Sequence, residues 1–374
     1  MNQEWQLSSE LIHLNHAAVG PWPERTRVAI NQFAEQNTHY GSLHYPQWLQ
    51  KEAELRTQLQ QLINANSHEE IALLKNTSEA LSVVAYGLDW QAGDNIVISN
   101  QEFPSNYIVW ESLKPLGVEV RYADLSTHDS PEDALIALCD SNTRLLSISS
   151  VQYASGLRMN LNRLGEHCKS KNIFFCVDAI QSIGAEVFDV QACQADFVMA
   201  DGHKWMLGPE GLALFYCRQD VMDKLKLKQY GWHMVENYLN FDDKNWQVAN
   251  SARRFECGSP NMLCIHALSA SVSLLLEIGM QQVSNQLQQK LNFLHEQLPH
   301  INHINVHSDS ALERRVGIIS FESEKIPSEE LFSYLKKQQV FCAMRAGKLR
   351  FSPHYYTADQ QLQQVVDILK SLSN

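Results

Sequence analysis

The chain has 374 residues, of which 44% are hydrophobic and 19% are charged, and its formal net charge is −12. This composition is typical of a soluble globular protein with a large and a smaller domain, and the acidic balance argues against a nucleic-acid-binding protein. No apolar run is long enough to cross a bilayer and the N-terminus lacks the features of a signal peptide, so we expect no membrane association. The eight cysteines form no CxxC pair, which predicts reduced thiols and a cytoplasmic location.

Short apolar runs that are typical of buried strands recur through the first two thirds of the chain. They lie at residues 95–99, 118–125, 144–152, 172–179, 195–200 and 212–217. Helix-like segments separate several of them, which predicts an α/β fold with a mainly parallel sheet covered by helices. The last run follows a tight Gly/Pro loop, so we expect that strand to be antiparallel.

At about residue 260 the short apolar runs give way to long helix-like segments, and a smaller α+β domain is predicted from there on. Its expected elements are long helices over 259–298, a strand over 315–323, a helix over 327–339 and a final helix from 357. Thr357 and Gln360 match a Thr-x-x-Gln capping box for that final helix. We therefore expect a large domain over residues 15–255 and a small C-terminal domain over residues 256–374, with residues 1–14 packing on the latter.

Ionisable side chains follow two neighbouring apolar runs at the point where each predicted strand ends. Asp178 lies at the end of the fourth run, one residue before its last position, and His203 and Lys204 closely follow the fifth. Ligand sites of open α/β sheets lie at the carboxyl ends of the strands, and a lysine buried there can form a Schiff base with a carbonyl through its neutral amine. Taken singly, Lys204 could be ion-paired and Asp178 could cap a helix. Together they are the two groups that pyridoxal chemistry requires.

A phosphate site is predicted where Asn76, Thr77 and Ser78 open a helix-like segment over 75–88. Free backbone N–H groups and hydroxyls at a helix start suit a phosphate, although the same residues could simply cap the helix. The chain contains neither GxGxxG nor GxxxxGK[ST], the glycine-rich motifs that would indicate nucleotide binding, so we do not predict a nucleotide site.

The sequence gives little support for a metal site or for a hydrolase triad. The segment PHINHINVH contains His300, His303 and His307, but if it is a strand His303 and His307 share one face, which is typical of a half-exposed strand with a polar face. No thiol or carboxylate cluster completes a site near His13 and His16, so we predict no metal site. No Gly-x-Ser-x-Gly elbow is present to anchor a hydrolase triad.

The segments VDAIQSIGA (177–185) and ADFVMADGHKWMLGPEGLALFYC (195–217) closely resemble the class V aminotransferase family of fold type I pyridoxal-phosphate enzymes. Cysteine desulfurases, selenocysteine lyases, kynureninase and isopenicillin N epimerase belong to this superfamily. The resemblance extends along most of the chain, and although each segment alone is weak, their combination is specific. The other matching segments are, in order, HLNHAAVGPWP, NTSEAL, QEFPSN, VQYASG, RRFECGSPN and RAGKLRFSPH.

The resemblance implies pyridoxal 5'-phosphate as the cofactor, bound by the large domain, and it implies roles around the cofactor's ring. Lys204 would hold the cofactor covalently and later shuttle the Cα proton. Asp178 would pair with the pyridine nitrogen, Gln181 would hydrogen-bond the ring hydroxyl and Phe103 would stack on the ring. Gln152 is a further residue expected in the cofactor pocket.

The resemblance also implies a phosphate site that is shared between two subunits. Thr77, Ser78 and His203 would hold the phosphate of their own subunit, and Ser259 would reach the phosphate of a neighbouring one. The site would therefore require a homodimer.

The chain departs from the family pattern at residues expected near the substrate and the phosphate. Arg350 resembles the arginine that grips the substrate α-carboxylate, with Trp232 as a further pocket residue, but the family's following Tyr-Asn-Thr is absent. Asp201 stands where many members carry a phosphate-binding Ser or Thr, and would repel phosphate unless it turns away. Desulfurases with an R-x-G-x-x-Cys loop have their sulfur-accepting thiol where this chain has Arg350, and Cys342, before the loop, is expected to be structural.

These features predict a pyridoxal-phosphate enzyme that acts at the amino group or α-carbon of an amino acid. The alternatives are a cysteine or selenocysteine lyase, an epimerase, and a non-catalytic relative that only binds the cofactor. Transamination, elimination and epimerisation all begin with removal of the α-proton, so the shared residues do not separate them.

Overall fold

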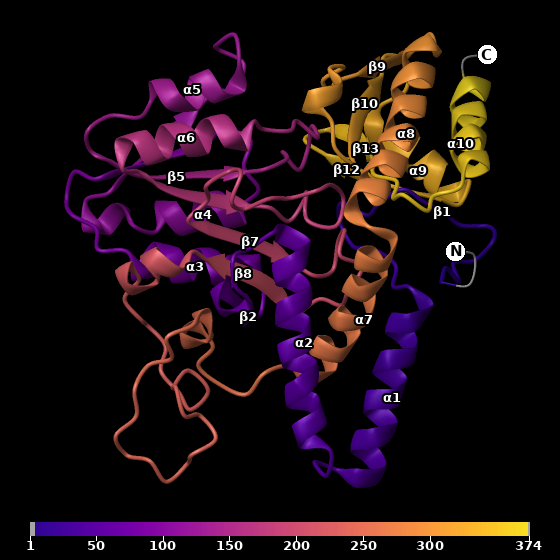
Figure 1. Ribbon diagram of the computed structural model, residues 1–374. Coiled ribbons are helices and arrows are strands. Elements are labelled where there is room, and N and C mark those ends of the chain that lie inside the picture. Colours follow the sequence, from indigo (N-terminus) through magenta and orange to yellow (C-terminus); the bar gives the residue numbers. More distant parts are fainter. Residues whose placement is uncertain (1–3, 373–374) are drawn as a thin grey trace.

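A seven-stranded sheet forms the centre of the molecule in the computed structural model, which describes residues 4–372 (Figure 1). In spatial order its strands are β2 (Ile71–Leu74), β8 (Ala213–Cys217), β7 (Phe197–Asp201), β6 (Phe174–Asp178), β5 (Thr143–Ser149), β3 (Asn95–Ser99) and β4 (Glu119–Ala123). The five strands from β7 to β4 run parallel, whereas β8 is antiparallel to both β7 and β2. The expected α/β class and the antiparallel last strand are therefore confirmed.

Helices cover both faces of this sheet. Successive strand residues point to opposite faces, so Val97 belongs to one core while its neighbours Ile96 and Ile98 belong to the other. The helices on the first face are α2 (Tyr45–Ile63), α5 (Pro131–Ala137) and α6 (Leu161–Lys171), and those on the second are α3 (Thr77–Gly87) and α4 (Ser105–Glu111). Burial on both faces explains why most of these strands appear in the sequence as continuous apolar runs.

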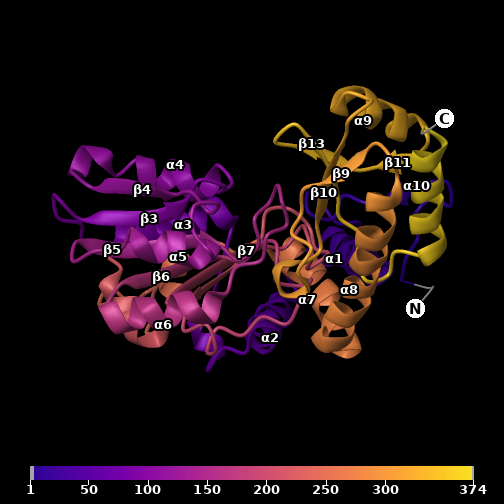
Figure 2. The same cartoon turned by 90° about the horizontal axis from the view of Figure 1, so that it is seen from above.

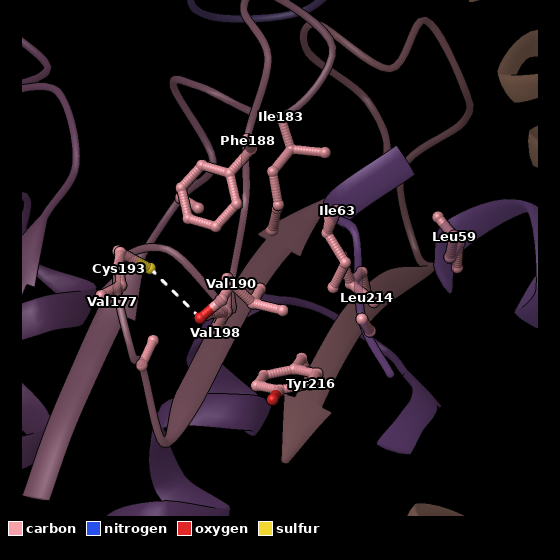
Figure 3. Packing of buried hydrophobic residues seen from close by; sticks show 14 of the residues in the cluster. Leu59, Ile63, Val177, Ile183, Phe188, Val190, Cys193, Val198, Leu214 and Tyr216 are labelled. Atoms are coloured by element: carbon pink, nitrogen blue, oxygen red, sulfur yellow. Dashed lines mark hydrogen bonds between the residues drawn. The ribbon is translucent and has the colours of Figure 1, made fainter. Parts of the chain in front are cut away.

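The core on the first face supports the strands that end at the predicted site. Figure 3 shows Val198 of β7 and Leu214 of β8 packed with Ile63 of α2, and all three are buried. The loop after β6 closes over them, and Cys193 Sγ donates a hydrogen bond of 3.7 Å to the carbonyl of Val190 within it. This dense packing gives the strand ends a fixed position.

A helical unit joins the large sheet to the C-terminal part. Helix α7 (Met262–Ile278) packs against α1 (Glu24–Tyr40) and α2, and α8 (Met280–Gln297) continues from it after Gly279. Among residues 4–372 no individual helix has the length and apolarity to cross a membrane, and α7 and α8 meet these criteria only as a pair bent by 84°.

The C-terminal part is built on a second, antiparallel sheet, which Figure 2 shows beside the large one. Its strands are β12 (Ala343–Arg345), β13 (Lys348–Phe351), β10 (Ile319–Ser323) and β9 (Ile304–Val306), accompanied by α9 (Ser328–Lys337) and α10 (Asp359–Ser371). Near the N-terminus, β1 (Ile12–His13) pairs in parallel with β11 (Val340–Phe341), so this segment lies on the C-terminal part. The division at residues 255 and 256 stays a prediction, because α7 packs on helices from the start of the chain.

The final helix is present, but its predicted cap is wrong. Helix α10 begins at Asp359 after an N-cap at Ala358 that makes no side-chain hydrogen bond. Thr357 Oγ1 instead accepts a hydrogen bond of 2.9 Å from the backbone N–H of His354. The hydroxyl therefore closes the preceding turn and does not serve the helix.

Candidate active site

A cavity of about 310 Å³ lies at the carboxyl ends of the parallel strands. Loops after β3, β5, β6 and β7 contribute to its wall, and the N-terminal segment, the start of α3 and strands β12 and β13 complete it. Its lining residues are 17–19, 76–78, Phe103, Ser105, Ser149, Tyr153, Asp178, Ile180, Gln181, Asp201, His203, Lys204, Glu210, Arg345 and Arg350. The structure thus brings together eight of the eleven residues predicted for the site.

Lys204 lies in the turn after β7, and two glycines pack closely against the backbone of this turn, one at Lys204 and one at the next residue, Trp205. A Cβ atom on Gly20 would lie 2.4 Å from the Lys204 carbonyl oxygen, and one on Gly184, whose φ is +95°, would lie 2.4 Å from the Trp205 carbonyl oxygen. Only glycine fits so close to the backbone at these two positions. Burial lowers the pKa of the Lys204 amine to about 8, an effect that the negative charge of Asp178 partly offsets. The lowered pKa makes the neutral, nucleophilic form of the amine more abundant near neutral pH than it is for an exposed lysine.

Asp178 is the last residue of β6 and is buried. Its Oδ1 accepts a hydrogen bond of 3.1 Å from the backbone N–H of Ile180, and no helix follows within the described residues up to β7 for it to cap. Burial raises the pKa of this carboxyl, although the Ile180 hydrogen bond and the charge of Lys204 oppose the rise. A cation against Asp178, such as a protonated ring nitrogen, would stabilise its ionised form.

The start of α3 offers groups for an anion. The Asn76 side chain caps the helix by accepting a hydrogen bond of 2.9 Å from the backbone N–H of Glu79. The buried hydroxyl of Thr77 has no hydrogen-bond partner among the described residues. Ser78 Oγ donates to Ser105 Oγ over 2.8 Å. A phosphate at this helix start would satisfy the Thr77 hydroxyl and the free N–H groups of the first turn.

Arg350, on β13, faces the cavity from the C-terminal part. Its side chain is buried, and Nη1 donates a hydrogen bond of 2.6 Å to the Tyr153 carbonyl oxygen. Its Nε and Nη2 atoms have no partner among the described residues. Burial, together with the charge of Arg345, lowers the pKa of the guanidinium to about 9. Two unpaired donors on one planar group are suited to a carboxylate.

Gln181 and Phe103 also line the cavity. The Gln181 Nε2 donates to the Ala17 carbonyl oxygen over 3.1 Å, and its Oε1 accepts from the indole N–H of Trp205 over 2.8 Å. This amide therefore ties the N-terminal segment to the turn that carries Lys204. Lys204 Nζ lies 5.7 Å from the centroid of the Phe103 ring, so an aromatic face borders the space beside the amine.

Three predicted residues do not line this cavity. Gln152 is buried behind it and donates a hydrogen bond of 3.0 Å to Glu102 Oε1. Ser259 is exposed and lines a different cavity of about 390 Å³. Trp232 lies within a long excursion of the chain before α7, where its ring contacts that of Phe241. The role expected for Ser259 concerns a neighbouring subunit, so its position outside this cavity leaves that prediction untested.

Sequence reasoning gave no role to three other residues at or beside the cavity. Tyr153 and Arg345 line it, and Glu102 lies buried behind it, where its carboxylate accepts hydrogen bonds from Ser149 and Gln152 among others. The signal for Glu102 and Tyr153 was present, since Glu102 lies three residues after the predicted strand over 95–99 and Tyr153 directly follows the one over 144–152. Arg345 could not be found in this way, because it is brought in by the second sheet.

Comparisons with known proteins agree with this geometry. The sequence pattern of the family described as "Aminotransferase class-V" matches residues 12–365. A probable cysteine desulfurase of Methanothermobacter thermautotrophicus is 29% identical over 388 residues, covering 97% of this chain and 94% of the relative. A cysteine desulfurase of Yersinia pestis is 30% identical over 303 residues, covering 78% and 71%. The structure of the cystine C–S lyase C-DES with its product cysteine persulfide has a TM-score of 0.90 at 21% identity and covers 97% and 98%, which shows a common fold.

Proposed function

Because the chain belongs to the class V aminotransferase family, we propose that it is a pyridoxal-phosphate-dependent C–S lyase that acts on an amino acid of the cysteine type. The observation that carries this proposal is the meeting of Lys204, Asp178 and Arg350 around one cavity. The substrate class comes from the relatives, which are named as cysteine desulfurases and as a cystine C–S lyase.

Pyridoxal 5'-phosphate is the cofactor, and when bound it supplies an aldehyde that reacts with amines and a ring that accepts electrons from the α-carbon. The cavity fits such a group, because the unpartnered Thr77 hydroxyl and the buried Asp178 carboxyl both face it. We assign Asp178 to the ring nitrogen, Thr77, Ser78 and His203 to the phosphate, and Phe103 to the ring face. Gln181 and Gln152 remain as candidates beside the ring.

Two side chains of this chain act on the substrate in this proposal. Arg350 binds the α-carboxylate through Nε and Nη2 and so fixes the orientation of the α-carbon. Lys204, whose pKa burial has lowered to about 8, takes the α-proton as a general base, a role for which a pKa near the working pH is favourable.

The fate of the sulfur distinguishes this proposal from a desulfurase. None of the described residues that line the cavity is a cysteine, and burial raises the pKa of the Cys342 thiol to about 12, which leaves it a poor nucleophile. We therefore propose that the C–S bond breaks by elimination and that the sulfur leaves with the electron pair as sulfide. Cysteine and water would then yield pyruvate, ammonia and hydrogen sulfide.

We also propose that the site is completed in a homodimer. Ser259 is exposed and available to the phosphate of a partner, and Trp232 lies in an excursion that carries the exposed side chains of Tyr230, Phe241 and Trp246. Measurement of the molar mass in solution, together with loss of cofactor affinity in Ser259→Ala, tests this part of the proposal.

Product analysis tests the reaction itself. The holoenzyme is incubated with cysteine, cystine, selenocysteine and a panel of other amino acids, and sulfide, pyruvate, ammonia and alanine are measured, with Lys204→Ala as the control. Pyruvate and ammonia in step with sulfide support the proposal, whereas alanine in their place indicates a desulfurase. An oxo acid without sulfur release indicates an aminotransferase, loss of chirality an epimerase, and no reaction with any of them a non-catalytic relative.

A further inference from the structure

A buried carboxylate behind the cavity holds the loop that carries Phe103. Glu102 directly precedes Phe103 in the loop between β3 and α4, and its side chain is buried. On this side of the cluster its oxygens accept hydrogen bonds from the Ser99 hydroxyl over 2.8 Å and from the Asn106 side-chain amide over 2.7 Å. These bonds fix the carboxylate relative to the end of β3.

The same carboxylate binds the end of the neighbouring strand β5. The backbone N–H of Ser149 donates to both Glu102 oxygens over 3.1 Å, and the Ser149 hydroxyl donates to Oε2. Gln152 Nε2 donates to Oε1 over 3.0 Å. Strands β3 and β5 are paired in the sheet, so one side chain joins the loops that follow two neighbouring strands.

These two loops carry two aromatic rings of the cavity wall. Phe103 and Tyr153 both line the cavity, and their ring centroids lie 5.2 Å apart in an edge-to-face arrangement. Phe103 is 41% exposed, so packing in the core does not fix its ring. The position of this ring therefore depends on the backbone of its loop, which Glu102 ties to the end of β5.

We propose that Glu102 is a positioning residue that joins the loops after β3 and β5 and thereby sets the Phe103 ring against the face of the cofactor's ring. Glu102 is not among the residues that line the cavity, so its effect on the cofactor passes through Phe103. This inference rests on the role proposed above for Phe103 at the ring face.

Glu102→Gln is the substitution that tests the carboxylate with little change in size. The Ser149 N–H lies 3.1 Å from each oxygen, so an amide nitrogen in either position would face this donor without an acceptor between them. At least one hydrogen bond of the cluster would be lost, and its loss leaves a buried polar group unsatisfied. We expect the loop to shift and the affinity for pyridoxal phosphate to fall by about tenfold.

The experiment is a double-mutant cycle on the dissociation constant of pyridoxal phosphate, measured by equilibrium dialysis. It uses the wild type, Glu102→Gln, Phe103→Ala and the double variant. Because Glu102 acts through Phe103, the loss of about tenfold should shrink to about twofold or less in the Phe103→Ala background.

Glu70→Gln is the matched control. Glu70 is also buried, and it accepts hydrogen bonds from the backbone N–H groups of Asn66, Ser67 and Gln219, none of which lines the cavity. We expect Glu70→Gln to destabilise the fold, as Glu102→Gln does, but to change the affinity for pyridoxal phosphate by less than about twofold.

Circular dichroism of the bound cofactor provides a readout that is independent of turnover. Its visible band reports how the ring is held in the site, so the band should weaken in Glu102→Gln and stay unchanged in Glu70→Gln. If Glu102→Gln does not fold, Ser99→Ala removes one donor to the carboxylate and should lower the affinity by about threefold, again only where Phe103 is present.

The outcomes separate this inference from the proposed function. Equal losses from Glu102→Gln, or from Ser99→Ala in its place, in both backgrounds would overturn the inference and leave the cofactor assignment intact. Equal losses from Glu102→Gln and Glu70→Gln would do the same. Wild-type affinity in Phe103→Ala would overturn the role of Phe103 and the inference with it, and a wild type that binds no pyridoxal phosphate would overturn the proposed function as well.

Discussion

Replacement of Arg350 by methionine gives a prediction whose magnitude follows from the geometry. The substitution keeps an apolar stem of similar length but removes the Nε and Nη2 donors, which have no partner among the described residues. Each charge-assisted hydrogen bond is worth about 1.5–3 kcal/mol net, so loss of two from a bound carboxylate costs about 3–6 kcal/mol. At about 1.4 kcal/mol per factor of ten, this corresponds to a loss of roughly 10²- to 10⁴-fold in amino-acid affinity.

The same substitution should not destabilise the fold. Arg350 is 1% exposed, and within residues 4–372 only its Nη1 has a protein acceptor. The enzyme without a bound substrate therefore already bears the cost of a buried, incompletely paired charge. We expect Arg350→Met to unfold at the same denaturant concentration as the wild type or at a higher one.

The assay is a titration of the holoenzyme's absorbance with an amino acid and, in parallel, with the matching amine that lacks the carboxylate. Arg350→Met should weaken binding of the amino acid and leave binding of the amine within about threefold. Arg345→Met is the matched control, because Arg345 also lines the cavity, and its effect should stay below about tenfold. Equal losses for amino acid and amine, or wild-type affinity for the amino acid in Arg350→Met, would refute the assignment.

Two further predictions concern the pH dependence of stability and the role of the Cys342 thiol in sulfide release. Burial lowers the pKa of His13 to about 4 and that of His354 to about 3. Both imidazoles therefore stay neutral in the native state, whereas in the unfolded chain they take up protons below about pH 6.5. The free energy of unfolding is therefore highest near pH 7 and falls as the pH falls towards 4. At pH 5 the loss is about 2 kcal/mol per histidine. Urea unfolding should show this slope, and a slope as steep in His13→Phe as in the wild type would contradict it. Cys342→Ser should release sulfide from cysteine at the wild-type rate, whereas a loss of more than tenfold in a folded protein would show that the thiol takes part.

The sequence predicted the part of the site that depends on strand ends. Asp178 and Lys204 follow neighbouring apolar runs, and parallel strands place their carboxyl ends at one edge, so their convergence could be foreseen. The wall formed by the second sheet could not be derived in this way, because Arg350 meets the Tyr153 carbonyl across 197 residues of sequence. Its assignment came from the family resemblance alone.

Predictions from local sequence patterns were wrong or missing where tertiary contacts determine the structure. The Thr357 motif reads as a helix cap, yet the hydroxyl closes the turn at His354. Strand β2 has only four residues (Ile71–Leu74) and was not predicted, because so short an apolar run carries no periodicity. The orientation of Asp201 towards His203 likewise depends on side-chain packing that a sequence does not display.

The central claim, that Lys204 holds pyridoxal phosphate in this cavity, is tested most directly by chemical trapping. The holoenzyme is reduced with borohydride, digested and mapped by mass spectrometry. We predict that the pyridoxyl group is found on Lys204 and that Lys204→Ala carries no label. Stoichiometric labelling of another lysine in the wild type, or undiminished labelling of Lys204→Ala, would contradict the account.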